Sequence, residues 1–174
     1  GALELSAVTL TLGAGRYALQ DFDTVTLRAR DALRGEGPGR LSVDADLAII
    51  APRFAAAPGA DLRVDAGSHK LSLHAPRAGG DVAAGAGARL ELAAGSVTLD
   101  SALRMPAGRV EILARSGDVR LGEQAAIDVG GRRLRLAEQW LDLDAGSVLI
   151  DAPHGDIVLD ARAQLDLDAV GDAD

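Results

Sequence analysis

The phrase "LELAAGSVTLD", residues 90–100, returns almost unchanged as "LDLDAGSVLID", residues 141–151. In both copies apolar residues recur at every second position on either side of a Gly-Ser corner. Alternation with a period of two predicts a β-strand that buries one face. Gly95 and Gly146 suit a bend between strands, because glycine adopts a left-handed backbone at little cost. The chain therefore repeats a strand–corner–strand unit.

A second repeated signal is the tripeptide Gly-Asp-Val or Gly-Asp-Ile, at residues 80–82, 117–119 and 155–157. The copies are 37 and 38 residues apart, and an alternating apolar pair begins eight residues after the end of each one. Internal periodicity of this kind indicates stacked repeats, in which each unit buries its apolar face only against its neighbours.

When the short strands are aligned at steps of mostly 20–24 residues, they form three ladders of apolar pairs, one ladder for each wall of a coil. Three strands per turn of about 22 residues follow from this alignment. A chain that climbs one strand spacing of about 4.8 Å per turn stacks such residues directly. The leading residues of the pairs are Leu71, Val97, Val119, Leu141 and Leu165 for the first wall, Val82, Leu103, Ile127 and Val148 for the second, and Leu62, Leu90, Val110, Leu134 and Ile157 for the third.

We therefore predict an all-β fold, a right-handed parallel β-helix with three strands and about 20–24 residues per turn. It should comprise a single segment over residues 1–174 with seven to eight turns, and should be a fragment of a longer repetitive protein. The alternative is a β-sandwich, whose strands also alternate, although the regular ladders would then be a coincidence.

The register is weakest over residues 1–60. The stretch "RDALRGEGPGR" (30–40) is interpreted as a loop with one helical turn, because three glycines and a proline interrupt it. The stretch "APRFAAAPGA" (51–60) is interpreted as a loose corner. The residues that continue the ladders here are Leu3, Val25 and Leu47 on one wall and Leu41, followed by Leu62, on another.

The repeats "LRMPAGRVEILARSGDV" (103–119) and "GDVRLGEQAAIDVGG" (117–131) resemble those of filamentous haemagglutinin-type exoproteins of bacterial two-partner secretion. The resemblance is clearest over residues 61–170. It implies a β-helical fibre, secreted or held at the bacterial cell surface, that serves adhesion, biofilm formation or contact-dependent delivery. The implied partners are flanking β-helical repeats of the same chain and a host-cell or surface receptor, either a glycan or a protein. The secretion domain of that family carries an Asn-Pro-Asn motif; this chain has no Asn and would correspond to the shaft.

The composition bears on the remaining function classes. The net charge is −8, which argues against nucleic-acid binding, since that needs clustered positive charge. No apolar run reaches the roughly 20 residues of a membrane helix, so no membrane insertion is expected. There is no Cys, which excludes disulfides and thiolate metal sites.

No catalytic, cofactor-binding or metal-binding residue is predicted. His69, His74 and His154 lack the convergent spacing that zinc requires. The acidic C-terminal third lacks the calcium-binding Gly-Gly-x-Gly-x-Asp repeat, and no serine stands in a Gly-x-Ser-x-Gly elbow. We expect a protein without enzymatic activity or cofactor.

One exposed contact is predicted. If Leu141 and Leu143 point into the core, then Trp140, Asp142 and Asp144 point outward. An exposed Trp can stack on a sugar or anchor a protein contact. Two alternatives stay open: a carbohydrate-active β-helix enzyme with clustered carboxylates in a groove, and a self-assembling β-helix polymer. The enzyme would need a pair such as Asp128 and Asp151 facing each other.

The middle residue of each strand should point outward and form a row with its counterparts one turn away. Opposite charges then meet along these rows, as do some like charges. The rows are Arg63, Glu91, Glu111, Arg135 and Val158 on the third wall, and Ser72, Thr98, Arg120, Asp142 and Asp166 on the first.

Overall fold

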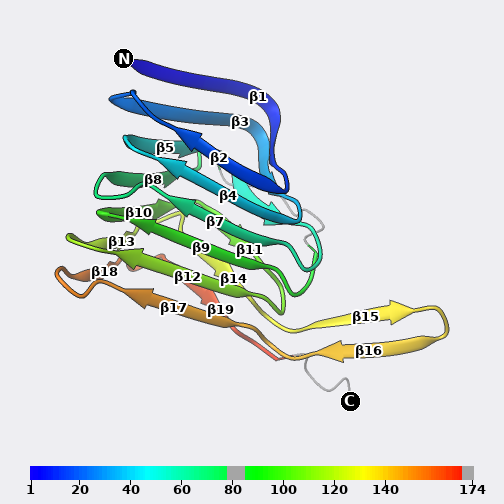
Figure 1. Cartoon of the computed structure of the whole chain (residues 1–174). Helices are drawn as coiled ribbons and strands as arrows, with labels where there is room; N and C mark the ends of the chain where they lie inside the picture. Colours follow the sequence, from blue (N-terminus) through cyan, green and yellow to red (C-terminus); the bar gives the residue numbers. More distant parts are fainter. Residues whose placement is uncertain (78–84, 170–174) are drawn as a thin grey trace.

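The computed structural model describes residues 1–77 and 85–169, and in them the chain forms strands, turns and loops without any helix. Parallel strands stack into a three-walled coil, a β-solenoid, with β1 at one end and β18 and β19 at the other (Figure 1). We call one passage of the chain around the coil a rung. Each rung runs through the first, second and third walls in that order. The predicted fold class is confirmed.

The walls are defined by their strands. Two long strands bend and run through the first and second walls; they are β1 (Ala2–Leu12) and β3 (Thr24–Gly35). The first wall continues through β5 (Asp46–Ile50), β8 (Lys70–His74), β10 (Ser96–Asp100), β13 (Val119–Leu121) and β18 (Ile157–Leu159). The second continues through β6 (Arg53–Ala56), β11 (Ala102–Arg104), β14 (Ala126–Asp128) and β19 (Gln164–Asp166). The third consists of β2 (Gly15–Leu19), β4 (Pro38–Val43), β7 (Asp61–Asp65), β9 (Arg89–Ala94), β12 (Arg109–Ala114) and β17 (Ser147–Asp151).

The third wall is a six-stranded parallel sheet, so five steps separate its first and last strands. The coil therefore makes about five turns between β2 and β17, fewer than the seven to eight that were predicted. The difference arises because some segments of the chain leave the coil, as described below.

The core lies between the three walls and is built mainly from Leu, Val, Ile and Ala. Leu62, Leu90 and Leu92 have 0% exposure, because inward positions on successive rungs cover one another. Phe54 and Met105 add larger side chains on the second wall. Stacking of identical positions explains why the inward residue must be apolar on every rung.

The second wall is one strand shorter than its neighbours. In that wall β6 pairs directly with β11, which places Phe54 beside Leu103. The first and third walls insert β8 and β9 at the same level, between β5 and β10 and between β7 and β12. The rung that contains β8 and β9 therefore contributes no described strand to the second wall.

Left-handed residues stack at the corner between the second and third walls. Glycine suits three of these positions because it lacks a Cβ, and an alanine occupies the fourth. Ala107 donates its backbone N–H to the carbonyl oxygen of Gly130 on the next rung, at 2.9 Å. The four residues are Gly37 (φ 67°), Gly59 (64°), Gly87 (73°) and Ala107 (52°).

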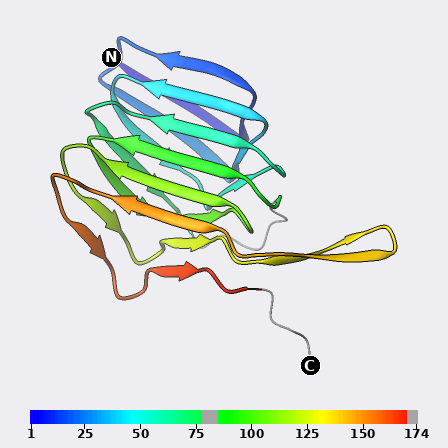
Figure 2. The same cartoon turned by 60° about the horizontal axis from the view of Figure 1, so that its bottom comes forward.

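On the rung after Ala107 the chain leaves this corner as an antiparallel hairpin, β15 (Arg132–Leu136) and β16 (Gln139–Leu143). The hairpin projects sideways from the coil and stands clear of it in both views (Figures 1 and 2). The chain then returns to the third wall as β17. Val110 and Val148 are consequently neighbours in that wall although they are 38 residues apart.

Three parts of the predicted ladders are confirmed. The structure pairs Leu71 with Val97 and Val97 with Val119 in the first wall. It pairs Leu103 with Ile127 in the second wall. It pairs Leu62, Leu90 and Val110 in the third wall.

The ladders are wrong after Val129, and one cause explains every error. Leu134 and Leu141 were assigned to walls, but they face each other in the hairpin. Each later residue therefore falls one wall away from its predicted place. Ile157 continues the first wall, Leu165 the second and Val148 the third. The sequence shows no sign of the insertion, because the hairpin strands alternate just as wall strands do.

The second ladder also contained Val82 and its partner Ala84, which lie outside the described residues. The two places beside β11 are held by β6 and β14.

Residues 1–60 are more regular than predicted. Leu3, Val25 and Leu47 do share the first wall. Leu41, however, pairs with Val64 and not with Leu62. Residues 30–40 belong largely to β3 and β4, without a helical turn, and residues 51–60 contain β6. Apolar burial at Ala32, Leu33 and Phe54 outweighs the turn preference of the neighbouring Gly and Pro.

Candidate functional site

The hairpin carries two of the three predicted contact residues. Trp140 lies on β16 with 64% of its surface exposed, and Asp142 follows it on the same face. The prediction that both point outward is confirmed, but its premise was wrong. Leu141 does not point into the core; it lies on the opposite face of the hairpin and is 45% exposed.

The first face of the hairpin is polar and aromatic. Arg133 donates two hydrogen bonds to Asp142, from Nε to Oδ1 at 2.6 Å and from Nη2 to Oδ2 at 2.9 Å. These bonds lower the pKa of Asp142, because they favour its charged form. The guanidinium of Arg135 lies 5.8 Å from the centroid of the Trp140 ring, within range of a cation–π interaction. We call these four residues the tryptophan face.

The second face of the hairpin is apolar, and we call it the leucine face. Leu134 and Leu141 lie opposite each other on it, 37% and 45% exposed, and Leu143 follows at the base. A hollow of about 610 Å³ separates the base of this face from the corner turns of the coil. Its lining consists of Leu134, Leu143, Asp144 and Ala145 on one side and Pro58, Gly85, Ala86, Gly87 and Ala107 on the other.

Asp144, the third predicted contact residue, is therefore separated from the other two. It is exposed and lines the hollow at the base of the hairpin, whereas Trp140 and Asp142 lie along the ribbon. The structure thus yields a contact pair of Trp140 and Asp142, supported by the two arginines opposite them.

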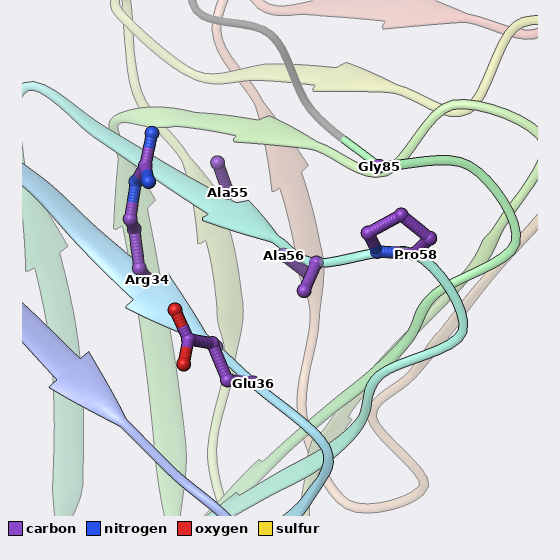
Figure 3. A pocket seen from close by; sticks show the side chains of 8 residues that line it. Arg34, Glu36, Ala55, Ala56, Pro58 and Gly85 are labelled. Carbon is purple, nitrogen blue, oxygen red and sulfur yellow. The ribbon is translucent and has the colours of Figure 1, made fainter.

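A second hollow, of about 210 Å³, opens where β3 and β6 end (Figure 3). Arg34 and Glu36 come from the end of β3, and Ala55, Ala56 and Pro58 follow one another across from them. Glu36 is the one carboxylate among its lining residues. Glycoside hydrolysis ordinarily uses two carboxylates, so the described lining does not supply that chemistry.

The outer face of the second wall holds further carboxylates, and arginines neutralise two of them. Asp128 lies 2.8 Å from Arg132 and 3.8 Å from Arg104, and Glu123 lies 3.0 Å from Arg162. The suggested facing of Asp128 and Asp151 is wrong. Asp128 has Arg104 and Asp166 as its strand neighbours, whereas Asp151 is on the third wall.

The described residues contain no group of three or more His, Cys, Asp or Glu side chains that could hold a metal ion. His69 has two carboxylate neighbours, with its Nε2 at 3.3 Å from Asp44 and its Nδ1 at 3.9 Å from Asp46. The strand β8 carries His74, while His154 is in the turn after β17. Nor does the described part of the chain contain any helix that could cross a membrane.

The charged rows of the walls are partly as predicted. Arg63 lies 3.0 Å from Glu91, and Glu91 has Glu111 as its neighbour in the next strand. The predicted pairs of Arg135 with Glu111 and of Arg120 with Asp142 are wrong, because Arg135 and Asp142 belong to the hairpin.

Sequence reasoning missed the two apolar ends of the coil. At the β1 end, Leu5 and Tyr17 are each 43% exposed and line a mostly apolar hollow of about 210 Å³. At the other end, Ile157 and Leu159 are 47% and 52% exposed. These residues continue the inward ladders, so only the position of a rung at the end of the stack distinguishes them from buried ones.

The fold and the hairpin define the class of protein: a β-solenoid with one lateral hairpin. No family model matches the chain, and searches of curated proteins and of solved structures likewise yield no match. The β-helical part of the resemblance to filamentous haemagglutinin-type exoproteins agrees with this fold, and the rest of it is a matter for proposal.

Proposed function

We propose that the chain is a structural and adhesive shaft segment of a large bacterial exoprotein, secreted or held at the cell surface, and that it has no enzymatic activity. The observation that carries this proposal is the hairpin, which holds an exposed Trp140 away from an otherwise regular coil. A stiff coil with a projecting aromatic side chain is suited to presenting a contact at a distance from its anchor.

The stiffness of the coil has a visible basis in contacts between rungs. Arg115, just after β12, reaches back past β9 to Asp65 on β7, with two hydrogen bonds of 2.8 Å each. Arg89 bonds Glu111 on the neighbouring strand at 3.1 Å. Such bonds oppose sliding of one rung over the next, in addition to the buried ladders.

The apolar ends support a shaft that continues. Leu5 at one end and Leu159 at the other hold equivalent inward positions in the first wall, linked through Leu27, Ile49, Leu73, Leu99 and Leu121. Further rungs of the same pattern, supplied by flanking repeats of the same chain, would bury both. The hydrophobic effect favours such coverage by about 25 cal/mol per Å² of apolar surface.

The contact itself is proposed to be with a receptor on a cell or surface, either a glycan or a protein. Trp140 would stack on or pack against it, and the Arg133–Asp142 pair would offer hydrogen bonds beside the ring. Asp144 lies too near the base to share this face.

Binding of the purified chain to bacterial and host-cell surfaces tests the proposal. Trp140→Ala should reduce binding at least tenfold, while Tyr17→Ala, which removes an exposed aromatic at the end of the coil, should leave it unchanged. The chain should also cleave none of a panel of acidic and neutral polysaccharides. Cleavage that disappears in Asp128→Asn would establish an enzyme instead.

The matching ends favour a second candidate, a self-assembling polymer in which copies stack end to end. Sedimentation of the purified chain would reveal such fibres, and Leu159→Asp should abolish them. Fibre formation that survives this change would remove the basis of the second candidate.

A further inference from the structure

The hairpin has two open edges and one exposed apolar face. In the described residues β15 pairs only with β16, and both of their outer edges lack a neighbouring strand. An isolated two-stranded hairpin is marginally stable in water, and three or more strands with an apolar face are needed for independent stability. An open edge is in turn a template for pairing with another strand.

We propose that β16 pairs with β16 of a second copy, antiparallel and about a two-fold axis at Leu141, to form a four-stranded sheet. This inference rests on the hairpin being a contact element, as proposed above, and identifies a second copy as a partner of its edge. Identical strands related by a two-fold axis satisfy the self-complementarity that a symmetric dimer requires.

The register follows from the two faces of the hairpin. Residues that pair across strands must have the same parity, or the tryptophan face of one copy would meet the leucine face of the other. An axis at Asp142 would set two carboxylates opposite each other, and an axis at Trp140 would set Asp142 opposite Glu138 of the second copy. Like charges directly opposite are destabilising. The axis at Leu141 sets Asp142 opposite Trp140 of the second copy and avoids both conflicts.

In this register the leucine face becomes continuous. Leu134 and Leu141 of one copy align with Leu141 and Leu134 of the other, so four side chains that are 37% or 45% exposed in the single chain form one apolar row. Cross-strand apolar pairs are the main source of sheet stability, so the row favours association.

The tryptophan face becomes a row that runs Arg133, Asp142, then Trp140 and Arg135 of the second copy. Arg135 lies over its own Trp140 ring, so each Asp142 would come close to a guanidinium of the other copy as well as to its own Arg133. At the two ends of the pair, Glu138 would approach Asp144 of the other copy, which opposes association.

The charges also select the edge. Pairing through β15 about Leu134 would set Arg133 directly opposite Arg135 of the second copy. Two arginines in that position repel each other, and no carboxylate of β15 would lie between them. The open edge of β16 is therefore the one that fits.

Cysteine cross-linking of the full chain tests the geometry, because the chain has no other cysteine. In the proposed dimer the two copies of Leu141 have Cα atoms about 4.5–5.5 Å apart, within disulfide reach. The two copies of Leu134 lie three strand spacings apart, about 14 Å, which is too far. Under mild oxidation Leu141→Cys should form a disulfide-linked dimer at least ten times faster than Leu134→Cys.

A second measurement checks the role of charge. The variant R133D/D142R keeps an ion pair inside the hairpin but brings an arginine next to Arg135 of the other copy. Sedimentation equilibrium should show a dimer for the unmodified chain and at least tenfold weaker association for this variant.

Several outcomes would overturn the proposal. These are equal cross-linking at positions 141 and 134, a chain that stays monomeric at all concentrations, and association that only Leu159→Asp abolishes. If a monomeric chain still binds cell surfaces through Trp140, the proposed function stands and the dimer falls. If the chain cleaves polysaccharide while Leu141→Cys cross-links, the dimer stands and the proposed function falls.

Discussion

Leu90 and Leu141 begin the two copies of nearly the same phrase, yet the coil and the hairpin treat them oppositely. Leu90 on β9 is fully buried, between Leu62 and Val110 of the neighbouring rungs. Leu141 on β16 is 45% exposed and has Leu134 as its one cross-strand partner. An alternating pattern therefore specifies a strand with one apolar face, and the neighbours of the strand decide whether that face is buried.

The largest expected difference is at these two leucines. Leu90→Ala should destabilise the chain by about 2–5 kcal/mol, since it opens a cavity in a filled core. Leu141→Ala should cost less than about 1 kcal/mol, as surface changes usually do. Urea unfolding of both variants measures this. Equal losses would mean that the hairpin packs against the coil and does not stand clear of it.

The ion pairs offer a second contrast. Burial raises the pKa of Asp65, but hydrogen bonds from Arg115, Arg63 and the Gly67 amide outweigh it and lower the value from 3.8 to about 2. A depressed pKa means that this stabilisation is complete above about pH 4 and is lost as the pH falls through about 2. Asp65→Asn should cost about 1 kcal/mol at pH 7, after allowance for solvent screening.

That cost should vanish in acid, so the unfolding curves of Asp65→Asn and the unmodified chain should converge near pH 2. Asp142→Asn breaks a pair that lies wholly within the exposed hairpin, and its effect on global unfolding should be smaller at every pH. A loss for Asp65→Asn that stays constant down to pH 2 would show that the Asp65 charge is not its cause.

Two alanines share the same strained backbone, one in each region. Ala107 at a coil corner and Ala137 at the hairpin turn both have φ of 52°. Ala107→Gly should raise the free energy of unfolding by about 0.5–1 kcal/mol, because the left-handed conformation costs alanine more than it costs glycine. Ala137→Gly should leave global unfolding unchanged, since the hairpin frays independently of the coil.

The inverse change supplies the control. Gly59 has φ of 64°, and no atom lies within 4 Å of where its Cβ would be. Gly59→Ala should therefore destabilise the coil through the backbone alone and by a similar amount. No change at either corner position would mean that the corner relaxes freely and contributes little to the stack.

The smallest effect is expected from removing the hairpin. Deletion of residues 132–145 joins Gly131 to Gly146, which imitates the corner that Ala107 and Gly108 make one rung earlier. The stability of the coil should change by less than about 1 kcal/mol, because the excised strands pair only with each other. Circular dichroism and urea unfolding would check this. Unfolding of the coil would show that the hairpin is part of its core.

The order of the residues within each strand was predictable, because inward and outward positions alternate with the pleat. The sequence also indicated the walls correctly from Leu62 to Val129, where rungs follow at regular steps. After Val129 the ladders slipped by one wall. Trp140 was predicted to be exposed and is, but for a reason that the hairpin replaces.

The amino-acid sequence by itself determined that this chain forms short strands with one apolar side, joined at glycine corners and repeated at about 22 residues. Those features depend on local geometry, where each residue needs to satisfy only its immediate neighbours. The tertiary structure alone decided which strands lie side by side. Pairing of Val110 with Val148 across 38 residues, and of β6 with β11 past an absent strand, depends on contacts between distant segments. No local pattern distinguishes a strand that stacks in the coil from one that leaves it, because both present the same alternating faces.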